Sequence, residues 1–163
     1  MNTCSAETYV AAELPDTVCQ LLQALVSNLH DENRLLALSA EFDPCGDYPH
    51  APHCYSRNIL LRNDEHAEVM VARWDQGAYT PIHGHPQYAF VYVLQGQLQL
   101  EHYHETAQGL VLTDTIIKRK GQHIYAAGDA NCFDNAIHRV TALAPSLSLH
   151  VYSDDASKGK SFL

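Results

Sequence analysis

Apolar side chains in the first quarter of the chain recur at helical spacing. They form two sets, Val18, Leu21, Leu22 and Leu25, then Leu35, Leu36, Leu38 and Phe42. This spacing puts each set on one face of a helix. Asp16 stands at the beginning of the first helix as a possible cap, and the second helix is predicted to start near Asp31. The pattern predicts two helices packed on something larger, after a poorly ordered lead over residues 1 to about 13.

The rest of the chain consists of short β-type runs separated by turn residues. The runs are 58–61, 67–74, 89–94, 97–103, 115–118, 138–143 and 147–152. Glycine-containing segments at 95–96, 120–122 and 127–131 mark turns, and the irregular segment 43–53 connects the helices to the first run. Many short strands at this spacing predict an antiparallel sandwich or barrel. The tail 154–163 is predicted as a loose end.

Length and charge narrow the classes of function. The chain has 163 residues, enough for one sizeable core, so a single domain is predicted. A formal net charge of −9 argues against nucleic acid or an anionic membrane surface as partner, and favours a small molecule or another protein. No apolar run approaches the roughly 20 residues that span a bilayer. The first residues lack the basic start and apolar segment of a secretion signal, so a cytoplasmic location is the default expectation.

Five cysteines are spread along the chain without a closely spaced metal-binding pair. An odd number cannot be bridged completely within the chain, and reduced thiols are the simplest expectation for a cytoplasmic protein. Cys45 and Cys54 could lie near each other in a loop, which leaves a disulfide as the less favoured alternative.

Two of the 11 histidines, His83 and His85, lie two residues apart, with a glycine and a proline shortly before them and a strongly β-forming run after them. Side chains two apart on a strand face the same side, so both imidazoles can bind one metal ion. His102 and His104 have the same spacing but follow the polar positions of a strand. We expect that second pair at the surface.

A stable site for a first-row metal needs at least one more ligand, from another strand. His138 follows a turn and begins a strand, which makes it the best candidate. His66, His123 and His150 remain alternatives that sequence spacing does not exclude.

The order of these motifs resembles the cysteine dioxygenase (thiol dioxygenase) family of the cupin superfamily. The resemblance rests on the pattern G-x5-H-x-H from Gly77, a strand that turns at Gly96 and a distant single histidine. Segments 74–103, 137–140 and 148–153 carry the more specific likeness.

The resemblance implies a mainly β fold, a cupin-type antiparallel β-barrel (jelly roll) with two N-terminal α-helices. A single cupin domain would span 1–163, with a helical part at about 14–42 and the barrel at about 54–153.

In this family three neutral histidines hold one ferrous iron, so the resemblance implies Fe2+ bound by His83, His85 and His138. Three imidazoles leave the centre with a charge of about +2, which favours an anionic thiolate and lowers the pKa of a coordinated thiol. The facial positions left open can take thiolate, amine and dioxygen. Both oxygen atoms can then go to sulfur, the sulfinate level of oxidation, without an external reductant.

The resemblance also assigns residues to the substrate. Tyr55 and Arg57 match the segment in which the family binds the substrate carboxylate, and a planar guanidinium suits a carboxylate in two bonds. A surface ion pair is the alternative role for Arg57. Trp74 matches a pocket-wall residue, with ordinary core as its alternative.

Ser148, His150 and Tyr152 alternate along one strand and therefore share a face. They resemble the family's hydrogen-bonded relay, whose tyrosine hydroxyl lies over the iron. Taken alone, an alternating polar strand is more typical of a solvent face.

The sequence departs from the family pattern at two points and from the wider cupin pattern at a third. Ala89 occupies the position at which some members carry a cysteine that crosslinks to the active-site tyrosine, so no crosslink to Tyr152 is expected from it. Ser153 is followed by Asp154 and not by the proline of many members. Residues 86–90 offer no carboxylate ligand, which favours a three-histidine iron site over a manganese cupin.

The expected function is oxidation of L-cysteine by O2 to cysteine sulfinic acid. The choice of substrate rests on Arg57, because in the family a glutamine there goes with 3-mercaptopropionate. The alternatives are a dioxygenase for another small thiol such as 3-mercaptopropionate, a cupin oxygenase for a non-thiol substrate, and a non-catalytic cupin that binds a metal or small ligand. We expect a monomer without a nucleic-acid or membrane partner.

Overall fold

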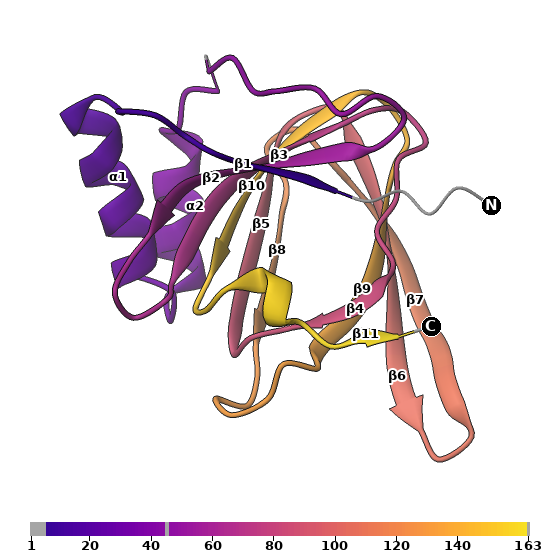
Figure 1. The fold of residues 1–163 in the computed structure, drawn as a ribbon. Coiled ribbons are helices and arrows are strands. Elements are labelled where there is room, and N and C mark those ends of the chain that lie inside the picture. Colours follow the sequence, from indigo (N-terminus) through magenta and orange to yellow (C-terminus); the bar gives the residue numbers. More distant parts are fainter. Residues whose placement is uncertain (1–5, 45, 163) are drawn as a thin grey trace.

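Two β-sheets face each other, and two helices pack on the outer face of one of them (Figure 1). A computed structural model describes residues 6–44 and 46–162. The helices of this part are α1 (Asp16–Ser27) and α2 (Glu32–Ala40), with a short 3-10 helix η1 (Ala156–Lys158) near the end of the chain. The six-stranded sheet has the order β1 (Glu7–Val10), β2 (Tyr55–Arg62), β3 (Glu68–Trp74), β10 (Ser146–Tyr152), β5 (Tyr88–Gln95), β8 (His123–Ala127). The five-stranded sheet has the order β11 (Ser161–Phe162), β4 (Ile82–His85), β9 (Asn135–Ala142), β6 (Gln97–Thr106), β7 (Gly109–Arg119).

The predicted mainly β fold with two N-terminal helices is confirmed, but the sheets form a sandwich and not a closed barrel. Closure would require a ladder between edge strands of the two sheets, and among the described residues the two sheets remain separate. Nearly all strand pairs are antiparallel, as predicted. The exception is β1, which pairs parallel with β2.

Both predicted helices begin close to the expected aspartates. The Asp31 carboxylate accepts a hydrogen bond from the Arg34 backbone N–H at 3.0 Å and caps α2. Pro15 precedes α1, so Asp16 lies in the first turn and is not the cap. Its charge still faces the positive end of the helix dipole.

Alternation along β3 and β10 divides their side chains between two cores. The outer core, between the helices and the sheet, contains Val69, Val71, Leu149 and Val151 with Leu22, Leu25, Leu35 and Leu38. The inner core, between the sheets, contains Ala72, Trp74, Val93, Leu98, Leu100 and Val140. Each fully buried leucine contributes about 1.5–3 kcal/mol relative to an exposed one. Because the outer core takes every second residue of β10, the residues between them face the space between the sheets.

The two predicted loose ends are instead strands, and these predictions are wrong for the described residues. Glu7–Val10 forms β1 along β2, and Ser161–Phe162 forms β11 along β4. Residues 1–5 and 163 lie outside the described residues. Such short edge strands obtain their hydrogen bonds from a neighbour, so their own residue pattern does not reveal them.

Cys19 and Cys132 are free thiols, as predicted. Cys54 is in a disulfide bond, so the prediction of reduced thiols is wrong for this residue. Cys4 and Cys45 lie outside the described residues. The path of an irregular loop decides which thiols meet, and spacing alone does not specify that path.

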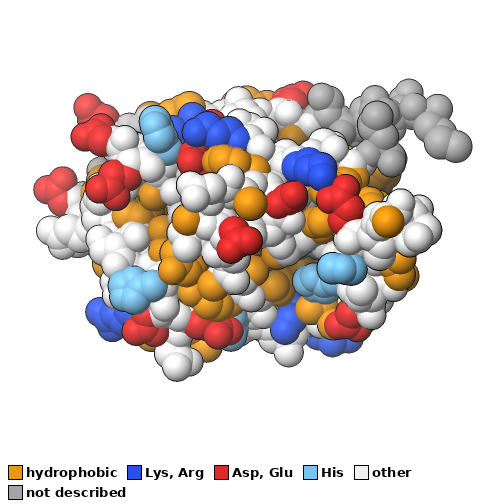
Figure 2. Space-filling view, turned by 90° about the horizontal axis from the view of Figure 1, so that it is seen from below, with side chains coloured by type: hydrophobic (Ala, Val, Ile, Leu, Met, Phe, Trp, Pro, Cys, Tyr) orange, Lys and Arg blue, Asp and Glu red, His pale blue; other side chains and the backbone are white. Residues whose placement is uncertain are grey.

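Charged side chains of both signs are spread over the face shown in Figure 2. On the face shown in Figure 2, acidic, basic and histidine side chains intermingle with apolar ones. The excess of acidic residues behind the net charge of −9 is thus distributed on that face and not gathered in one patch. Neither helix among residues 6–44 and 46–162 is long and apolar enough to cross a bilayer.

Candidate metal centre

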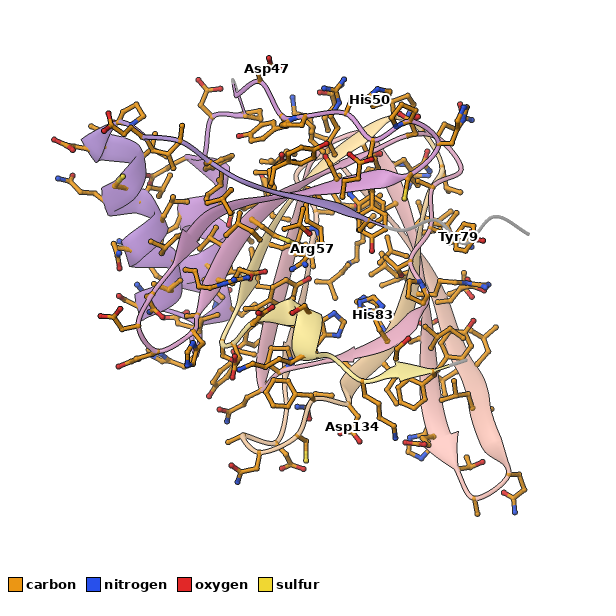
Figure 3. The ribbon with its side chains drawn as sticks, in the orientation of Figure 1. Asp47, His50, Arg57, Tyr79, His83 and Asp134 are labelled. Atoms are coloured by element: carbon orange, nitrogen blue, oxygen red, sulfur yellow. The ribbon has the colours of Figure 1, made fainter. Side chains whose placement is uncertain are left out.

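Three histidines from two neighbouring strands converge between the sheets. His83 and His85 lie on β4, and His83 is directly opposite His138 of β9 in the antiparallel ladder. One nitrogen from each ring lies within 4.8 Å of the others, and the ring centroids are 4.4–4.9 Å apart. Figure 3 shows the His83 imidazole in the interior between the sheets. A single ion can therefore contact all three rings.

Gly84, between the two β4 histidines, permits a close approach of the segment before β9. A Cβ at this position would lie 2.4 Å from Asp134 Cα and 2.6 Å from the Phe133 carbonyl oxygen. Both neighbours are backbone atoms, so a larger residue would push β4 and that segment apart. The glycine thus helps to set the spacing of the ligand pair.

Two of the three histidines are almost fully buried, at 2% exposed for His85 and 5% for His138. Neither ring nitrogen of His85 has a hydrogen-bond partner among residues 6–44 and 46–162. The Nδ1–H of neutral His83 donates to the Pro81 carbonyl oxygen at 2.9 Å, which leaves its Nε2 lone pair available. Buried nitrogens without partners are costly in a protein interior, and a bound metal would satisfy them.

Burial keeps the three rings uncharged. It lowers the pKa of His85 to about 3 and holds the pKa values of His83 and His138 below their ordinary range. Neutral imidazole is the form that binds a metal, so the donor set fits a divalent first-row ion held by three nitrogens.

The other histidines named as possible ligands have different surroundings. His123 Nε2 lies 2.8 Å from a carboxylate oxygen of Glu32 on α2. His66 is exposed, and His150 is held in a hydrogen-bonded chain on β10. Of the alternatives left open by spacing, the structure brings only His138 to the β4 pair among the residues it describes.

The second closely spaced pair is only partly at the surface. His104 is exposed, as predicted. His102 is half-buried, opposite His138 in the β6–β9 ladder with the ring centroids 6.0 Å apart. The prediction of a surface site is therefore wrong for His102, because the neighbouring strand β9 covers one side of it.

A chain of hydrogen bonds runs along the inner face of β10. Ser148 Oγ lies 2.7 Å from His150 Nε2, and His150 Nδ1 lies 2.8 Å from the Tyr152 hydroxyl. The chain extends to β3, where the Trp74 indole N–H donates to Ser148 Oγ at 2.9 Å. All four side chains are buried.

The indole gives this chain a direction, because its nitrogen can only donate. Ser148 accepts from Trp74, so its own hydrogen goes to His150 Nε2. Burial lowers the pKa of His150 to about 3, so the ring is neutral and donates from Nδ1 to the Tyr152 oxygen. Burial also raises the pKa of Tyr152 well above its ordinary value, which keeps the phenol protonated. Its hydroxyl hydrogen is left for a group in the adjacent cavity.

A cavity of about 270 Å³ contains the three histidines and Tyr152. Arg57, Tyr55 and Trp74 line it as well, and Figure 3 shows Arg57 in the same interior region as His83. Tyr55 stacks on Trp74 with ring centroids 4.4 Å apart. The site residues expected from the sequence therefore border one space, apart from Ser148, which contacts it through His150.

Ala89 is directly opposite Tyr152 in the β5–β10 ladder, and the two pack in one buried cluster. The position therefore faces the tyrosine but offers no sulfur. Ser153 accepts a hydrogen bond from the Tyr88 backbone N–H at 3.0 Å and ends β10.

Sequence reasoning missed several contributions to the cavity, including Ala6 and Thr8 at the N-terminal end. The C-terminal segment supplies Ala156, Ser157, Gly159 and Ser161 to its lining. Fully buried Glu68 accepts a hydrogen bond from Arg57 and so touches the site indirectly. The signal for Glu68 was present, since an acidic residue interrupts the start of an otherwise apolar run at 67–72. No comparable signal marks the tail.

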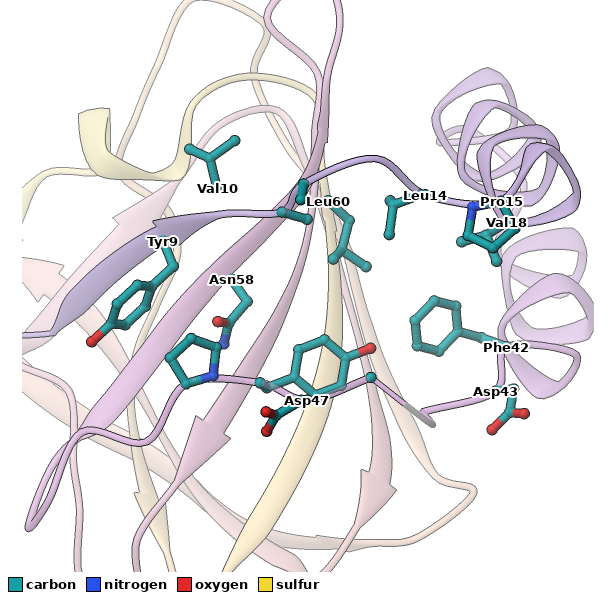
Figure 4. Close-up of a pocket in the computed structure, with 15 residues that line it drawn as sticks. Tyr9, Val10, Leu14, Pro15, Val18, Phe42, Asp43, Asp47, Asn58 and Leu60 are labelled. Carbon is teal, nitrogen blue, oxygen red and sulfur yellow. The ribbon is translucent and has the colours of Figure 1, made fainter.

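A larger cavity of about 570 Å³ lies elsewhere, between β1, the start of α1 and the segment 42–49 (Figure 4). Its lining is mostly apolar and includes Val10, Leu14, Val18, Phe42 and Leu60. None of the predicted site residues is in its described lining, so its size does not make it the candidate centre.

Comparisons with known proteins identify a family for this chain. The sequence model of the family described as cysteine dioxygenase type I matches residues 1–162. A search of curated proteins finds no match.

Several solved structures are similar in fold. One, from a study of the mechanism of oxalate oxidase, is 12% identical with a TM-score of 0.56, over 76% of this chain and 63% of that chain. An RmlC-like cupin protein from Desulfovibrio desulfuricans is 12% identical with a TM-score of 0.50, over 70% and 96%. A cupin superfamily protein from Desulfitobacterium hafniense is 11% identical with a TM-score of 0.49, over 74% and 88%. At such identities the first two show the fold alone, and the predicted cupin-type fold is confirmed.

Proposed function

This chain belongs to the cysteine dioxygenase type I family, and on that premise we propose that it oxidises L-cysteine with O2 to cysteine sulfinic acid at a ferrous iron. The observation that carries the proposal is the presence of three uncharged histidines and a guanidinium in one cavity. The overall reaction, thiol plus O2 to sulfinic acid, balances without a further reductant.

His83, His85 and His138 would hold the iron, because they offer three neutral nitrogens and two of the rings are almost fully buried. When bound, ferrous iron supplies a Lewis acid for the thiolate and the redox chemistry that O2 requires. With no carboxylate among the three ligands, the centre retains its positive charge for an anionic substrate.

Arg57 would bind the substrate carboxylate, and Tyr55 and Trp74 would form the wall beside it. The Arg57 side chain is only 15% exposed, so an ionic hydrogen bond made there is less screened than one at the surface. A bidentate contact would orient the amine and sulfur of the amino acid toward the histidines.

Tyr152 would donate its hydroxyl hydrogen to the sulfur or to oxygen in the cavity. The relay from Trp74 through Ser148 and His150 supports this role, because it supplies a donor to the tyrosine oxygen and leaves the phenol hydrogen free. The same bonds hold the phenol in place, so little reorganisation is needed when substrate binds.

Anaerobic loading with Fe(II), followed by oxygen uptake with single thiols, tests the proposal. We expect uptake with L-cysteine, one sulfinic acid formed per O2 consumed, and little uptake with 3-mercaptopropionate. His138→Ala is the matched control and should lose both iron and uptake. Faster turnover of 3-mercaptopropionate would assign a different thiol. Absence of uptake with any small thiol, from protein shown to hold iron, would leave a non-catalytic binding cupin.

A further inference from the structure

Glu68 is a carboxylate without exposure to water, at the beginning of β3. A buried carboxylate is retained only when cations and hydrogen bonds offset the loss of hydration. In the ladders on either side, Glu68 is opposite Arg62 of β2 and Tyr152 of β10. It therefore lies next to Tyr152, which lines the cavity.

Two arginines share this carboxylate. Arg57 Nη2 donates to Glu68 Oε1 at 2.9 Å. Arg62 donates to the other oxygen, Oε2, from Nε at 3.2 Å and also from Nη2. A bulge in β2 between Ile59 and Leu61 shifts the alternation by one residue, which brings Arg57 and Arg62 to the same face.

Because Glu68 is shared between two arginines, positive charge remains available for a ligand. The hydrogen-bonded group of two guanidiniums and one carboxylate has one net positive charge, which attracts a single ligand carboxylate. The Asp155 carboxylate, 3.6 Å from Arg62 and 23% exposed, offsets only part of this charge, because the contact is longer and partly screened by solvent. If Glu68 had Arg57 as its only partner, the two would neutralise each other. With Arg62 on Oε2, Glu68 can fix Arg57 while the pair of arginines keeps its attraction for an anion.

The same carboxylate connects the arginine to the C-terminal segment. Arg62 Nη2 lies 3.6 Å from Asp155 Oδ2. Asp155 in turn accepts hydrogen bonds from the backbone N–H and the hydroxyl of Ser157, at 2.8 and 2.6 Å, and so caps η1. Because residues after Asp155 line the cavity, the Glu68–Arg62–Asp155 contacts hold this wall in place.

We propose that Glu68 is a positioning residue that, shared between Arg57 and Arg62, makes the cavity select ligands with a carboxylate. The proposal rests on the proposed function in one respect, that Arg57 receives the ligand carboxylate. One Nη2 hydrogen bond to Glu68 restrains the guanidinium, and its remaining N–H groups serve the ligand.

The test measures anaerobic binding to the Fe(II)-loaded protein, by calorimetry, with two probes. L-Cysteine has the carboxylate, and 2-aminoethanethiol is the same amino thiol without it. For Glu68→Gln we expect the dissociation constant of L-cysteine to rise about tenfold or more, as for a lost ionic hydrogen bond, while that of 2-aminoethanethiol changes less than about twofold. Glu101→Gln is the matched control, because Glu101 binds Arg139 at 2.6 Å in the other sheet. It should change neither constant.

Arg62 provides a second route if Glu68→Gln does not fold, because its side chain is 43% exposed and tolerates change. Arg62→Met should weaken L-cysteine binding selectively, since Glu68 is then left to neutralise Arg57 alone. Arg62→Lys keeps the charge and should restore most of the affinity. If Glu68 had only a structural role, its replacement would change the dissociation constants of both probes alike, or of neither.

Binding is measured without turnover, so the proposal and the proposed function fail separately. Wild-type protein that binds L-cysteine selectively but consumes no O2 would refute the dioxygenase and leave the role of Glu68 intact. The role is refuted if wild type does not prefer L-cysteine over 2-aminoethanethiol. It is also refuted if folded, iron-loaded Glu68→Gln still prefers L-cysteine over 2-aminoethanethiol. If Glu68→Gln does not fold, the same preference in Arg62→Met refutes the role.

Discussion

The direction of the relay depends on one atom, the Nε1 hydrogen of Trp74. We predict that Trp74→Phe lowers kcat for thiol oxidation by about fivefold, the equivalent of one neutral hydrogen bond of about 1 kcal/mol. Without the indole donor, the Ser148 hydroxyl can turn away from His150, and Tyr152 is then free to donate to His150 and not to the ligand. Oxygen uptake at saturating thiol measures the effect.

Loss of packing at Trp74 is separated from loss of the donor by a double-mutant cycle. In a Ser148→Ala background the relay is already broken, so Trp74→Phe should have little further effect on kcat. An undiminished effect of Trp74→Phe in that background would show that the indole acts by filling space and stacking on Tyr55.

Ala89 offers a second test at this scale, because it is directly opposite the relay tyrosine. We predict that Ala89→Cys, loaded with Fe(II) and turned over with thiol and O2, forms a thioether to Tyr152 with loss of two hydrogen atoms. Both positions lie in one buried cluster, so the new sulfur would be next to the phenol ring. Mass spectrometry of the intact protein and of its peptides detects the link. Ala89→Ser, of nearly the same size, should stay unmodified, and an unlinked thiol after many turnovers would contradict the assumed proximity.

Among the elements, β10 was the most predictable and the C-terminal segment the least. Period-two alternation correctly predicted that Ser148, His150 and Tyr152 share a face, because a strand buried on both sides must alternate between two cores. The meeting of His138 with the β4 pair depends on the pairing of β4 with β9, which are far apart in the chain. The residue pattern made His138 the best candidate but left three other histidines open, and only the resemblance to a family singled it out. Nothing in the short polar tail indicates that it pairs with β4.

The tail belongs to the site because it packs directly on the strand that carries two of the candidate ligands. The Gly84 backbone N–H donates to the Lys160 carbonyl oxygen at 2.8 Å, and Ser161 is opposite His83 in the β11–β4 ladder. A Cβ on Gly159 would lie 2.2 Å from the Gly84 carbonyl oxygen, a backbone atom that cannot turn aside. The position of β4 and the path of the tail therefore depend on each other.

We predict that Gly159→Ala lowers the free energy of unfolding by about 1–3 kcal/mol, the usual cost of overpacking. Because the strain falls on β4, bound iron should also be lost more readily. Metal analysis after dialysis against a weak chelator, together with denaturant unfolding, measures both. Gly109→Ala, at the β6–β7 turn, has no atom near the added Cβ but has a φ of +116°, so it should also lose stability. It should nevertheless keep its iron, because this strain does not fall on β4. Full iron retention by Gly159→Ala would mean that the tail does not support the centre.

Across the whole molecule, the sandwich buries basic groups as well as apolar ones. His85, His138 and His150 are all at most 5% exposed, and burial holds the pKa of each below the ordinary value. In the absence of metal these rings are a latent source of acid instability, because folding prevents them from taking up protons that the unfolded chain would bind.

The direction of the pH dependence follows from the lowered pKa values of His85 and His150. His85 and His150 titrate near 6.5 in the unfolded chain and at about 3 in the folded protein. Between these values the unfolded state binds more protons, so stability is complete above about pH 6.5 and is lost as the pH falls toward 3. Each such histidine contributes a slope of up to about 1.4 kcal/mol per pH unit in that window. Denaturant unfolding of metal-free protein at a series of pH values measures the total slope.

Replacing one buried histidine separates this effect from the general titration of carboxylates. His150→Gln removes one group that resists protonation, so its slope between pH 6.5 and 3 should be smaller than that of wild type by up to about 1.4 kcal/mol per pH unit, whatever its stability at neutral pH. Equal slopes for His150→Gln and wild type would mean that His150 is protonated within the fold, and the neutral relay inferred from its contacts would then be incorrect.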